Sequence, residues 1–161
     1  MRDDDFDRLF EEHAQPLYGF LVYRTGDRAL AEDLLADTFE RVLRARRRFD
    51  RRRASEKTWI YAIALNLLRD HARRQSAEAR ARERVGAPVS GSDDLALGRV
   101  EQHDDLLRAM GALSPSEREA IALRYGADLT VPEIAKLKKE PLTTAEGRVY
   151  RALRKLRQEL S

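Results

Sequence analysis

The sequence of 161 residues contains no cysteine, only 8 glycines and only 5 prolines. The absence of cysteine excludes a disulfide framework, a thiolate zinc site and a cysteine nucleophile. No apolar run approaches the roughly 18 residues that a transmembrane helix requires. The start of the chain, Met1 to Asp5, is acidic where a secretion signal would be basic and then apolar. We therefore expect a cytoplasmic protein that does not insert into membranes.

Charge is abundant and unevenly distributed. Charged residues make up 37% of the chain, well above the usual share of about a quarter, although the net charge is only +3. The net charge of successive segments is −7 for residues 1–40, +7 for 41–53, +3 for 54–84, −4 for 85–105 and +4 for 106–161. Basic segments separated by acidic ones predict two surfaces that face a polyanion and one that is kept away from it. A set of solvated helix faces would explain any single segment equally well.

Apolar spacing predicts three helices in the first half of the chain, over residues 5–25, 27–47 and 56–79. Within the first helix Pro16 lacks a backbone donor and should kink or split it, and Gly26 should end it. The arginine-rich stretch between the second and third helices has no apolar period and predicts a basic loop. Few glycines and prolines among many Ala, Leu, Arg and Glu favour helix over sheet throughout.

Residues 80–99 combine Gly, Pro, Ser and Asp without periodicity, which predicts a flexible linker. The linker divides the chain into an N-terminal module, residues 1–79, and a C-terminal module, residues 100–161. Each module is small, so each hydrophobic core should be modest.

The C-terminal module is predicted to contain four short helices, beginning with one over residues 97–113. The sequences Ser114–Glu117 and Thr130–Glu133 are capping boxes that would open the second and third helices. The third and fourth helices, within residues 129–156, fit a helix-turn-helix. The predicted fold class is therefore all-α: two small helical modules joined by a flexible linker, the C-terminal one a helix-turn-helix.

Nothing in the sequence indicates catalysis. The three histidines, His13, His71 and His103, have no metal-ligand partner three or four residues away. There is no glycine-rich phosphate loop, no HExxH motif and no GxSxG motif. We therefore expect no enzymatic activity, no metal and no cofactor.

The last predicted helix has residues suited to reading duplex DNA. Its first turns would meet base edges, and they contain Thr143, Thr144, Glu146, Gly147 and Arg148. Its later cations would meet phosphates, and they are Arg151, Arg154, Lys155 and Arg157. Thr144 and Arg148 are four residues apart, so we expect both to point away from the apolar side, with Arg148 at or beside a base edge. A plain amphipathic helix with a basic outer face would show the same pattern.

The third predicted helix has residues suited to single-stranded nucleic acid. Aromatic and cationic side chains follow the basic loop in the order Trp59, Tyr61, Asn66, Asp70, Arg73 and Arg74. Any base can stack on an aromatic ring while arginine holds the phosphates. The amide of Asn66 could bond the edge of a flipped base. For Tyr61 we favour a place in the core.

These stretches resemble a known family. Residues 31–39 (AEDLLADTF) and 59–74 (WIYAIALNLLRDHARR) look like region 2 of an extracytoplasmic-function sigma factor, of the sigma-70 family. Residues 113–120 (LSPSEREA) and 129–156 are similar to region 4 of the same family. The order, the spacing and the position of the linker also match, so the resemblance covers nearly the whole chain.

The resemblance implies a bacterial transcription initiation factor that binds core RNA polymerase, recognises the −10 and −35 promoter elements and assists promoter melting. The implied partners are core RNA polymerase, through its β′ clamp helices and β flap, and promoter DNA, both as duplex and as melted single strand. An anti-sigma factor is left open. The linker matches the segment that the family threads through polymerase.

Site residues are carried over from the family position by position. The implied polymerase-binding residues are Glu32, Asp33, Asp37, Phe39 and Glu40. The implied −10 DNA-binding residues are Arg51, Arg52, Arg53, Lys57, Trp59, Asn66, Asp70, Arg73 and Arg74. The implied −35 DNA-binding residues are Thr143, Thr144, Glu146, Arg148, Arg151, Arg154 and Lys155.

The sequence departs from the usual family pattern at several positions. It has Ala36 where the family commonly has Gln, Leu65 where it has Arg, and Thr143 and Ala145 where it has Gly and Val. In the turn of the helix-turn-helix, Lys138-Lys139 replaces an apolar residue followed by glycine. Because this turn has no residue suited to positive φ, we expect either a loosely packed C-terminal module or an unusual DNA preference.

Two other functions therefore stay open at this point. One is a helix-turn-helix regulator that acts without the polymerase core. The other is a diverged protein-interaction module that has lost DNA binding.

Overall fold

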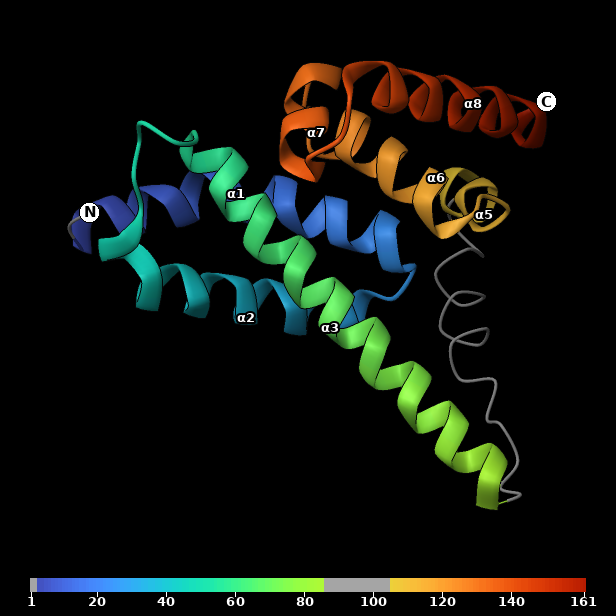
Figure 1. The fold of residues 1–161 in the computed structure, drawn as a ribbon, viewed down its shortest axis with the longest axis horizontal. Coiled ribbons are helices and arrows are strands. Elements are labelled where there is room, and N and C mark those ends of the chain that lie inside the picture. Colours follow the sequence, from blue (N-terminus) through green and yellow to red (C-terminus); the bar gives the residue numbers. More distant parts are fainter. Residues whose placement is uncertain (1–2, 86–104) are drawn as a thin grey trace.

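The computed structural model describes residues 3–85 and 105–161, which form helices joined by short connections (Figure 1). No strand occurs in these two ranges, as the predicted fold class requires. None of the helices found there is long and apolar enough to cross a membrane. Only residues 80–85 of the predicted linker are described. Residues 86–104, which include the rest of that linker and the predicted start of a helix at residue 97, lie outside the described ranges.

The N-terminal module consists of α1 (Asp3–Thr25), α2 (Arg28–Ala45), the 3₁₀ turn η1 (Arg46–Arg48) and α3 (Glu56–Val85). Helix α1 runs unbroken through Pro16, so the predicted split does not occur. Pro16 is exposed, whereas Leu9 and Leu17 on the other side are fully buried and hold both halves of the helix to the core. Gly26 ends α1 as predicted, with φ of 71° and its N–H bonded to the Val22 carbonyl at 2.7 Å.

Side chains fix where α2 and α3 begin. The Asp27 carboxylate accepts the Leu30 N–H at 3.1 Å, which caps α2. The Ser55 hydroxyl likewise accepts the Thr58 N–H at 3.1 Å, which caps α3. These caps agree with the starts that apolar spacing predicted.

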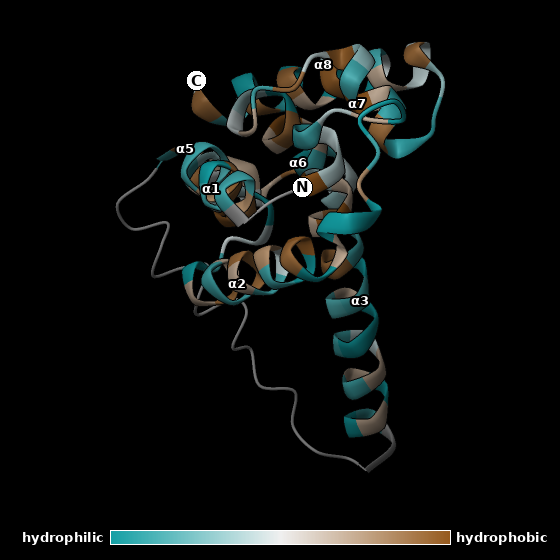
Figure 2. Cartoon of the chain, turned by 90° about the vertical axis from the view of Figure 1, so that its left-hand side faces the viewer, coloured by the Kyte–Doolittle hydropathy of each residue, from teal (hydrophilic) through white to brown (hydrophobic). Residues whose placement is uncertain are grey.

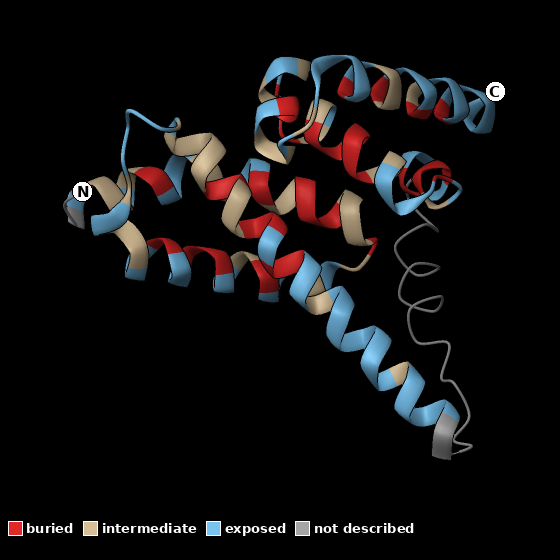
Figure 3. Cartoon of the chain, viewed as in Figure 1, coloured by how far each residue is buried: buried red, intermediate tan, exposed pale blue. Residues whose placement is uncertain are grey.

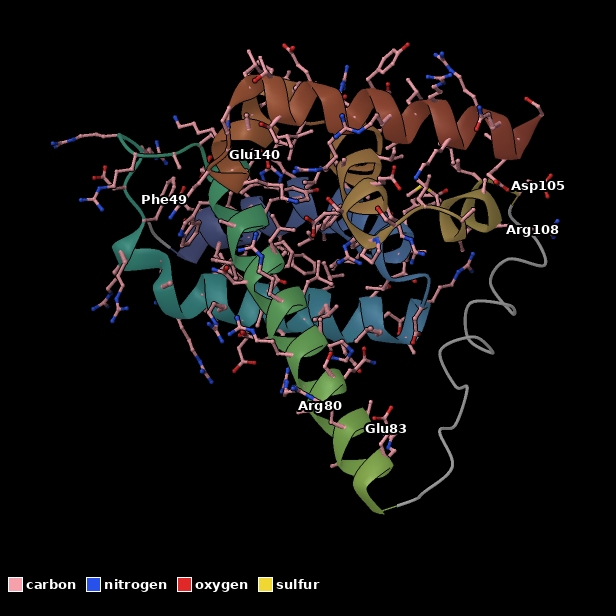
Figure 4. The ribbon with its side chains drawn as sticks, turned by 45° about the vertical axis from the view of Figure 1, so that its right-hand side comes forward. Phe49, Arg80, Glu83, Asp105, Arg108 and Glu140 are labelled. Atoms are coloured by element: carbon pink, nitrogen blue, oxygen red, sulfur yellow. The ribbon has the colours of Figure 1, made fainter. Side chains whose placement is uncertain are left out.

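Helix α3 continues past the predicted end at Ala79 and reaches Val85. This part of α3 is almost entirely exposed (Figure 3), so tertiary packing does not explain it. Its composition of Ala, Arg and Glu has high helix propensity, and Glu78 pairs with Arg82 one turn on at 3.6 Å. The side chains of Arg80 and Glu83 project into solvent along it (Figure 4). Helix therefore replaces the first residues of the predicted linker.

The C-terminal module contains α5 (Asp105–Gly111), α6 (Pro115–Ile121), the π-helical turn η2 (Ala122–Gly126), α7 (Val131–Lys138) and α8 (Leu142–Leu160). Both predicted capping boxes form, one opening α6 and the other opening α7. Helices α7 and α8, with the short turn between them, make the predicted helix-turn-helix.

The turn between α7 and α8 closes without a glycine. Lys139 itself adopts the left-handed conformation, with φ of 54°. Its N–H donates to the Lys136 carbonyl at 3.3 Å, and the Glu140 N–H donates to the Ala135 carbonyl at 3.0 Å. The expectation of a loosely packed C-terminal module or an unusual DNA preference rested on the premise that no residue of this turn suits positive φ. The structure corrects this: the turn is well formed, and a non-glycine residue bears a conformational cost of about 1–2 kcal/mol.

The buried side chains form one continuous core that reaches through both modules, rather than two separate modest cores. Helix α1 packs against α2 on one side and against η2 and α6 on the other (Figure 1), and both teal and brown residues occur along these helices (Figure 2). The ring of Phe20 meets that of Tyr61 edge-on at 5.5 Å, while the main chain of Phe20 lies against Gly126. The two modules are therefore packed together through α1.

We predict that Lys139→Gly raises the free energy of unfolding by about 0.5–1 kcal/mol, because glycine adopts positive φ without the steric cost. Urea unfolding of the full chain measures the change. The matched control is Lys136→Gly, an exposed position inside α7, which should lower the free energy of unfolding by about 1 kcal/mol. Equal destabilisation by both substitutions would contradict the assignment of strain to Lys139.

Candidate nucleic-acid interface

Helix α2 presents an acidic face to solvent. The capped start at Asp27 sets the helix register, and apolar positions such as Leu34 and Val42 then turn inward. The predicted polymerase-binding acids are all exposed on the other side, and they are Glu32, Asp33, Asp37 and Glu40. Glu40 pairs with Arg44 at 2.6 Å, whereas Asp33 and Asp37 have no ion-pair partner within the described chain. This face is available to a basic protein surface.

Phe39 does not belong to that exposed face. Only 4% of its surface is accessible, and its ring packs edge-on against Phe10 at 5.0 Å and Phe6 at 6.3 Å. The inclusion of Phe39 among direct polymerase contacts is therefore corrected to a packing role. Phe10 and Leu43 remain partly exposed beside it and line a groove of about 610 Å³ between α1 and α2.

The predicted basic loop joins η1 to α3 and is ordered by Asp50. The Asp50 carboxylate accepts the Arg52 N–H at 3.0 Å, and its carbonyl accepts the Arg53 N–H at 3.1 Å. Three guanidinium groups, on Arg51, Arg52 and Arg53, remain exposed on this loop. The loop therefore concentrates positive charge on a defined backbone.

An aromatic pair stands at the base of this loop. The ring of Phe49 lies 4.8 Å from the ring of Trp59, with 37° between their planes. The pair borders a pocket of about 480 Å³ whose other walls include Arg48, Asp50 and Arg53. Aromatic rings beside arginines suit a nucleic-acid base with its phosphate. Figure 4 shows Phe49 on the segment that leads into the loop.

Farther along α3, polar side chains continue the same side of the helix. Asn66, Asp70 and Arg73 follow Trp59 at spacings of seven, four and three residues, so the four share one face. All three are exposed, as is Arg74. The Asp70 carboxylate holds Arg73 at 3.1 Å, and Asn66 keeps its amide nitrogen free of any described partner. The structure thus brings these predicted −10 residues together.

Tyr61 lies in the core, as favoured from the sequence. It is fully buried, burial raises the pKa of its phenol far above the ordinary value, and its hydroxyl has no hydrogen-bond partner among the described residues. His13 is half-buried, and burial lowers the pKa of its imidazole. No group of three metal-ligating side chains occurs within residues 3–85 and 105–161.

Helix α8 turns its basic side outward along its whole length. Ala145, Val149, Ala152 and Leu156 are buried against the module. The exposed predicted −35 residues are Thr143, Thr144, Glu146, Arg151, Arg154 and Lys155. Lys155 bonds Glu117 of α6 at 3.0 Å and is therefore only partly free for phosphate.

Arg148 differs from the expectation that it points away from the apolar side. Its side chain is only 21% exposed, on the flank of α8 next to the buried positions. One guanidinium nitrogen, Nη1, contacts both carboxylate oxygens of Glu140, at 2.6 and 2.8 Å. Glu140 lies in the turn before α8 (Figure 4). Arg148 thus ties α8 to the turn through Nη1, and its other guanidinium nitrogens have no partner among the described residues.

Two aromatic residues with accessible surface could not be singled out from the sequence. Phe49 lies in an arginine-rich stretch without apolar period, where it is the only aromatic residue, and it pairs with Trp59. Tyr150 was passed over on α8, where 66% of its surface is accessible. Its spacing of seven residues from Thr143 and four from Arg154 would have placed it on the outer face.

Charged contacts join the two modules. Glu119 of α6, buried to 8% exposure, accepts a hydrogen bond from Arg24 of α1 at 3.3 Å and another from Lys138 of α7. Burial acts to raise the pKa of Glu119, but the hydrogen bond and charge of Lys138, with the charge of Arg24, outweigh burial and hold the pKa below its ordinary value. Lys57 at the start of α3 also donates to the Asp128 carbonyl at 3.2 Å. The predicted −10 residue Lys57 is therefore engaged with the C-terminal module in this structure.

Comparison with known families assigns both modules. Residues 9–78 match the family described as Sigma-70 region 2, and residues 103–156 match Sigma-70, region 4. The RNA polymerase sigma factor CarQ of Myxococcus xanthus is 36% identical over 98% of this chain and 90% of CarQ. The ECF RNA polymerase sigma factor BldN of Streptomyces coelicolor is 31% identical over 95% of this chain, which spans 59% of the length of BldN.

Solved structures give the same fold. The sigma factor RpoE, in complex with the anti-sigma factor NepR from Bartonella quintana, superposes with a TM-score of 0.80 at 23% identity, over 98% of this chain and 97% of RpoE. CnrH, in complex with the cytosolic domain of CnrY, superposes with a TM-score of 0.72 at 24% identity, over 99% of this chain and 89% of CnrH.

We predict that Glu119→Gln lowers the free energy of unfolding at neutral pH by about 3 kcal/mol, because Lys138 and Arg24 would lose a buried counter-charge. The folded-state pKa lies below the ordinary value of 4.5, so the stabilisation is complete above that value and is lost as the pH falls through the folded-state pKa. In Glu119→Gln, the free energy of unfolding should lack the part of its pH dependence that comes from the Glu119 carboxylate. Urea unfolding from neutral to acidic pH tests both points, with exposed Glu159→Gln as control; identical profiles for Glu119→Gln and wild type would refute the role.

Proposed function

The chain belongs to the extracytoplasmic-function sigma factors of the sigma-70 family, and on this premise we propose how its surfaces divide the work of promoter-specific transcription initiation. Sigma factors of this family bind core RNA polymerase and direct it to promoters. In the proposal α2 docks on polymerase, the basic loop and α3 read the −10 element, and α8 reads the −35 element. The chain carries no catalytic activity of its own and acts in the cytoplasm, where the polymerase is.

The observation that carries the proposal is the aromatic pocket beside the basic loop. Phe49 and Trp59 border a pocket walled by Arg48 and Arg53, and the exposed amide of Asn66 lies on the same face of α3 as Trp59. A stacking surface with free cations serves unpaired bases, since a base within a duplex cannot reach it. A regulator that binds only duplex DNA has no use for such a pocket.

The −35 role of α8 is supported by its position in the helix-turn-helix. Thr143, Thr144 and Glu146 are exposed in its first turns, the part of a recognition helix that enters the major groove. Arg151 and Arg154 follow on the exposed side, at the depth of the phosphates. The basic outer face then supplies affinity, and the first turns supply sequence preference.

The polymerase role of α2 is supported by charge. Asp33 and Asp37 are exposed, one helical turn apart, and keep their charges free of described cations. An unpaired acidic stripe favours a basic partner surface over DNA. The groove that Phe10 and Leu43 line next to it adds apolar area for the same partner.

The proposal includes an anti-sigma partner. RpoE is seen bound to the anti-sigma factor NepR, and CnrH is seen bound to the cytosolic domain of CnrY. In this chain an apolar pocket of about 510 Å³ opens where Tyr23 of α1 meets Met110, Tyr125 and Leu153 of the C-terminal module. Such a pocket suits the apolar side of a partner helix.

The two alternative functions lose their support. The interaction-module hypothesis rested on Lys138-Lys139, yet Lys139 closes a well-formed turn and Lys138 pairs with Glu119. The regulator hypothesis leaves the pocket beside Trp59 without a role.

Run-off transcription with purified core polymerase on genomic templates tests the proposal, with start sites mapped. We expect specific transcripts only when the chain and core polymerase are both present. Tight binding to a palindromic duplex by the chain alone, unaffected by polymerase, would support the regulator instead.

We predict that Asp33→Arg or Asp37→Arg abolishes binding of core polymerase, because each places a cation against the basic surface that the stripe should meet. Pull-down of core polymerase measures this, and circular dichroism checks folding. The matched control is Glu159→Arg, also exposed and unpaired within the described chain, at the far end of α8. Normal retention of core polymerase by both α2 variants would contradict the proposal that α2 docks on polymerase.

We predict that Asn66→Ala reduces opening of the −10 element about tenfold, and that it reduces binding to duplex promoter less. An amide can pair with a base edge only after that base leaves the stack, so the loss should appear on opening. Permanganate footprints report unpaired thymines, and Gln75→Ala, farther along α3, is the control. Normal opening by the Asn66 variant would disprove the role.

A further inference from the structure

One acidic residue on the recognition helix has no structural explanation. The other acidic side chains from Asp105 to Glu140 all have partners, which are Arg108 for Asp105, Lys155 for Glu117, Lys138 for Glu119, Arg124 for Asp128, the Thr130 N–H for Glu133 and Arg148 for Glu140. On α8 itself, Glu146 and Glu159 have no such partner among the described residues. Glu159 lies at the far end of α8, whereas Glu146 lies in the part that should enter the groove.

Helix stability does not account for Glu146. The residues three and four positions away are Leu142, Thr143, Val149 and Tyr150, and none is a cation. The helix begins after Pro141, and its first turn contains no acidic residue, so Glu146 lies beyond the reach of the helix dipole. The nearest arginine, Arg148, is already held by Glu140.

On a DNA-binding face this charge has a cost. The exposed side of α8 otherwise carries Arg151, Arg154 and Arg157, which attract phosphates, and a carboxylate among them weakens that attraction. The cost is offset only where DNA presents a hydrogen-bond donor to the carboxylate. In the major groove those donors are the exocyclic amino groups of cytosine and adenine.

Cytosine fits a carboxylate better than adenine does. Cytosine presents its N4 amino group alone, whereas adenine places the acceptor N7 beside its amino group, where it would repel the second carboxylate oxygen. Guanine and thymine present acceptors at the corresponding positions and would repel the carboxylate outright. One carboxylate thus selects one base and disfavours the other three.

We propose that Glu146 accepts a hydrogen bond from the N4 amino group of a cytosine in the −35 element and so specifies one C·G pair. The inference rests on the proposed function, in that α8 lies in the major groove. The neighbouring Gly147 is consistent with it, because a glycine adds no side chain beside Glu146, where a Cβ would begin 3.1 Å from the Arg151 guanidinium. Glu140 contributes by holding Arg148 away from Glu146.

The experiment uses holoenzyme reconstituted from core polymerase and the full chain. Promoters randomised across the upstream element are selected by binding and sequenced, at two salt concentrations. Wild type is compared with Glu146→Gln, and with Glu159→Gln as a control that removes the same charge from the same helix. Both positions are exposed, so neither substitution should affect folding.

We expect wild-type holoenzyme to select an upstream motif with a cytosine at one position. Glu146→Gln should reduce the preference for cytosine there about tenfold and move it toward adenine, which a glutamine amide can bond at N6 and N7, with the other positions unchanged. Glu159→Gln should leave the motif as it is.

Two results would overturn the inference alone. One is that Glu146→Gln leaves the motif unchanged and raises the affinity for every sequence equally, which would mean that Glu146 only repels phosphates and reads no base. The other is a shift at a position where wild type does not prefer cytosine. A wild-type holoenzyme that selects no upstream motif at all would overturn the −35 role of α8, and the inference with it.

Discussion

The packing of Phe20 joins the two modules, and the arrangement of the molecule depends on it. Its ring meets Tyr61 of α3 edge-on, while its main chain lies against Gly126 of the C-terminal module. Helix α1 is thereby covered on two sides and belongs to both modules at once. Helices α2 and α8 consequently lie on opposite sides of α1 (Figure 1), so the proposed polymerase-binding and −35 surfaces belong to helices that α1 separates.

Local signals predicted most of the fold, because each acts within a few residues. The capping boxes at Ser114 and Thr130 and the glycine at position 26 gave helix boundaries that the structure confirms. The premise that no residue of the turn between α7 and α8 suits positive φ was wrong, because the exposed Lys139 adopts it and local backbone hydrogen bonds close the turn. The contacts between modules were not predictable, since Arg24, Glu119 and Lys138 are brought together only by the docking of α1.

The site was predicted unevenly for a related reason. Residue types and helical spacing identified the acidic face of α2 and the polar face of α3, because exposure follows from periodicity. Periodicity is too coarse for the flanks of a helix, so Arg148 was placed on the outer face although it pairs with Glu140. Periodicity also says nothing about contacts between side chains on either side of a loop, so it could not predict that the ring of Phe49 packs against Trp59. Phe39 was also misplaced: it lies among the acidic residues of α2 in the sequence, but its side chain is buried in the core.

The contact of Lys57 with Asp128, together with the packing of α7 against α3, holds the helix-turn-helix beside the start of α3. Promoter elements about 25 base pairs apart occupy roughly 85 Å of duplex. The docked arrangement cannot span that length, so only undocked molecules are competent to hold both elements. Undocking costs free energy, and the apparent affinity for a complete promoter falls with the fraction of undocked molecules. Under the proposed function, a polymerase that held the modules apart would remove this penalty, and polymerase and promoter would then bind cooperatively without touching each other's sites.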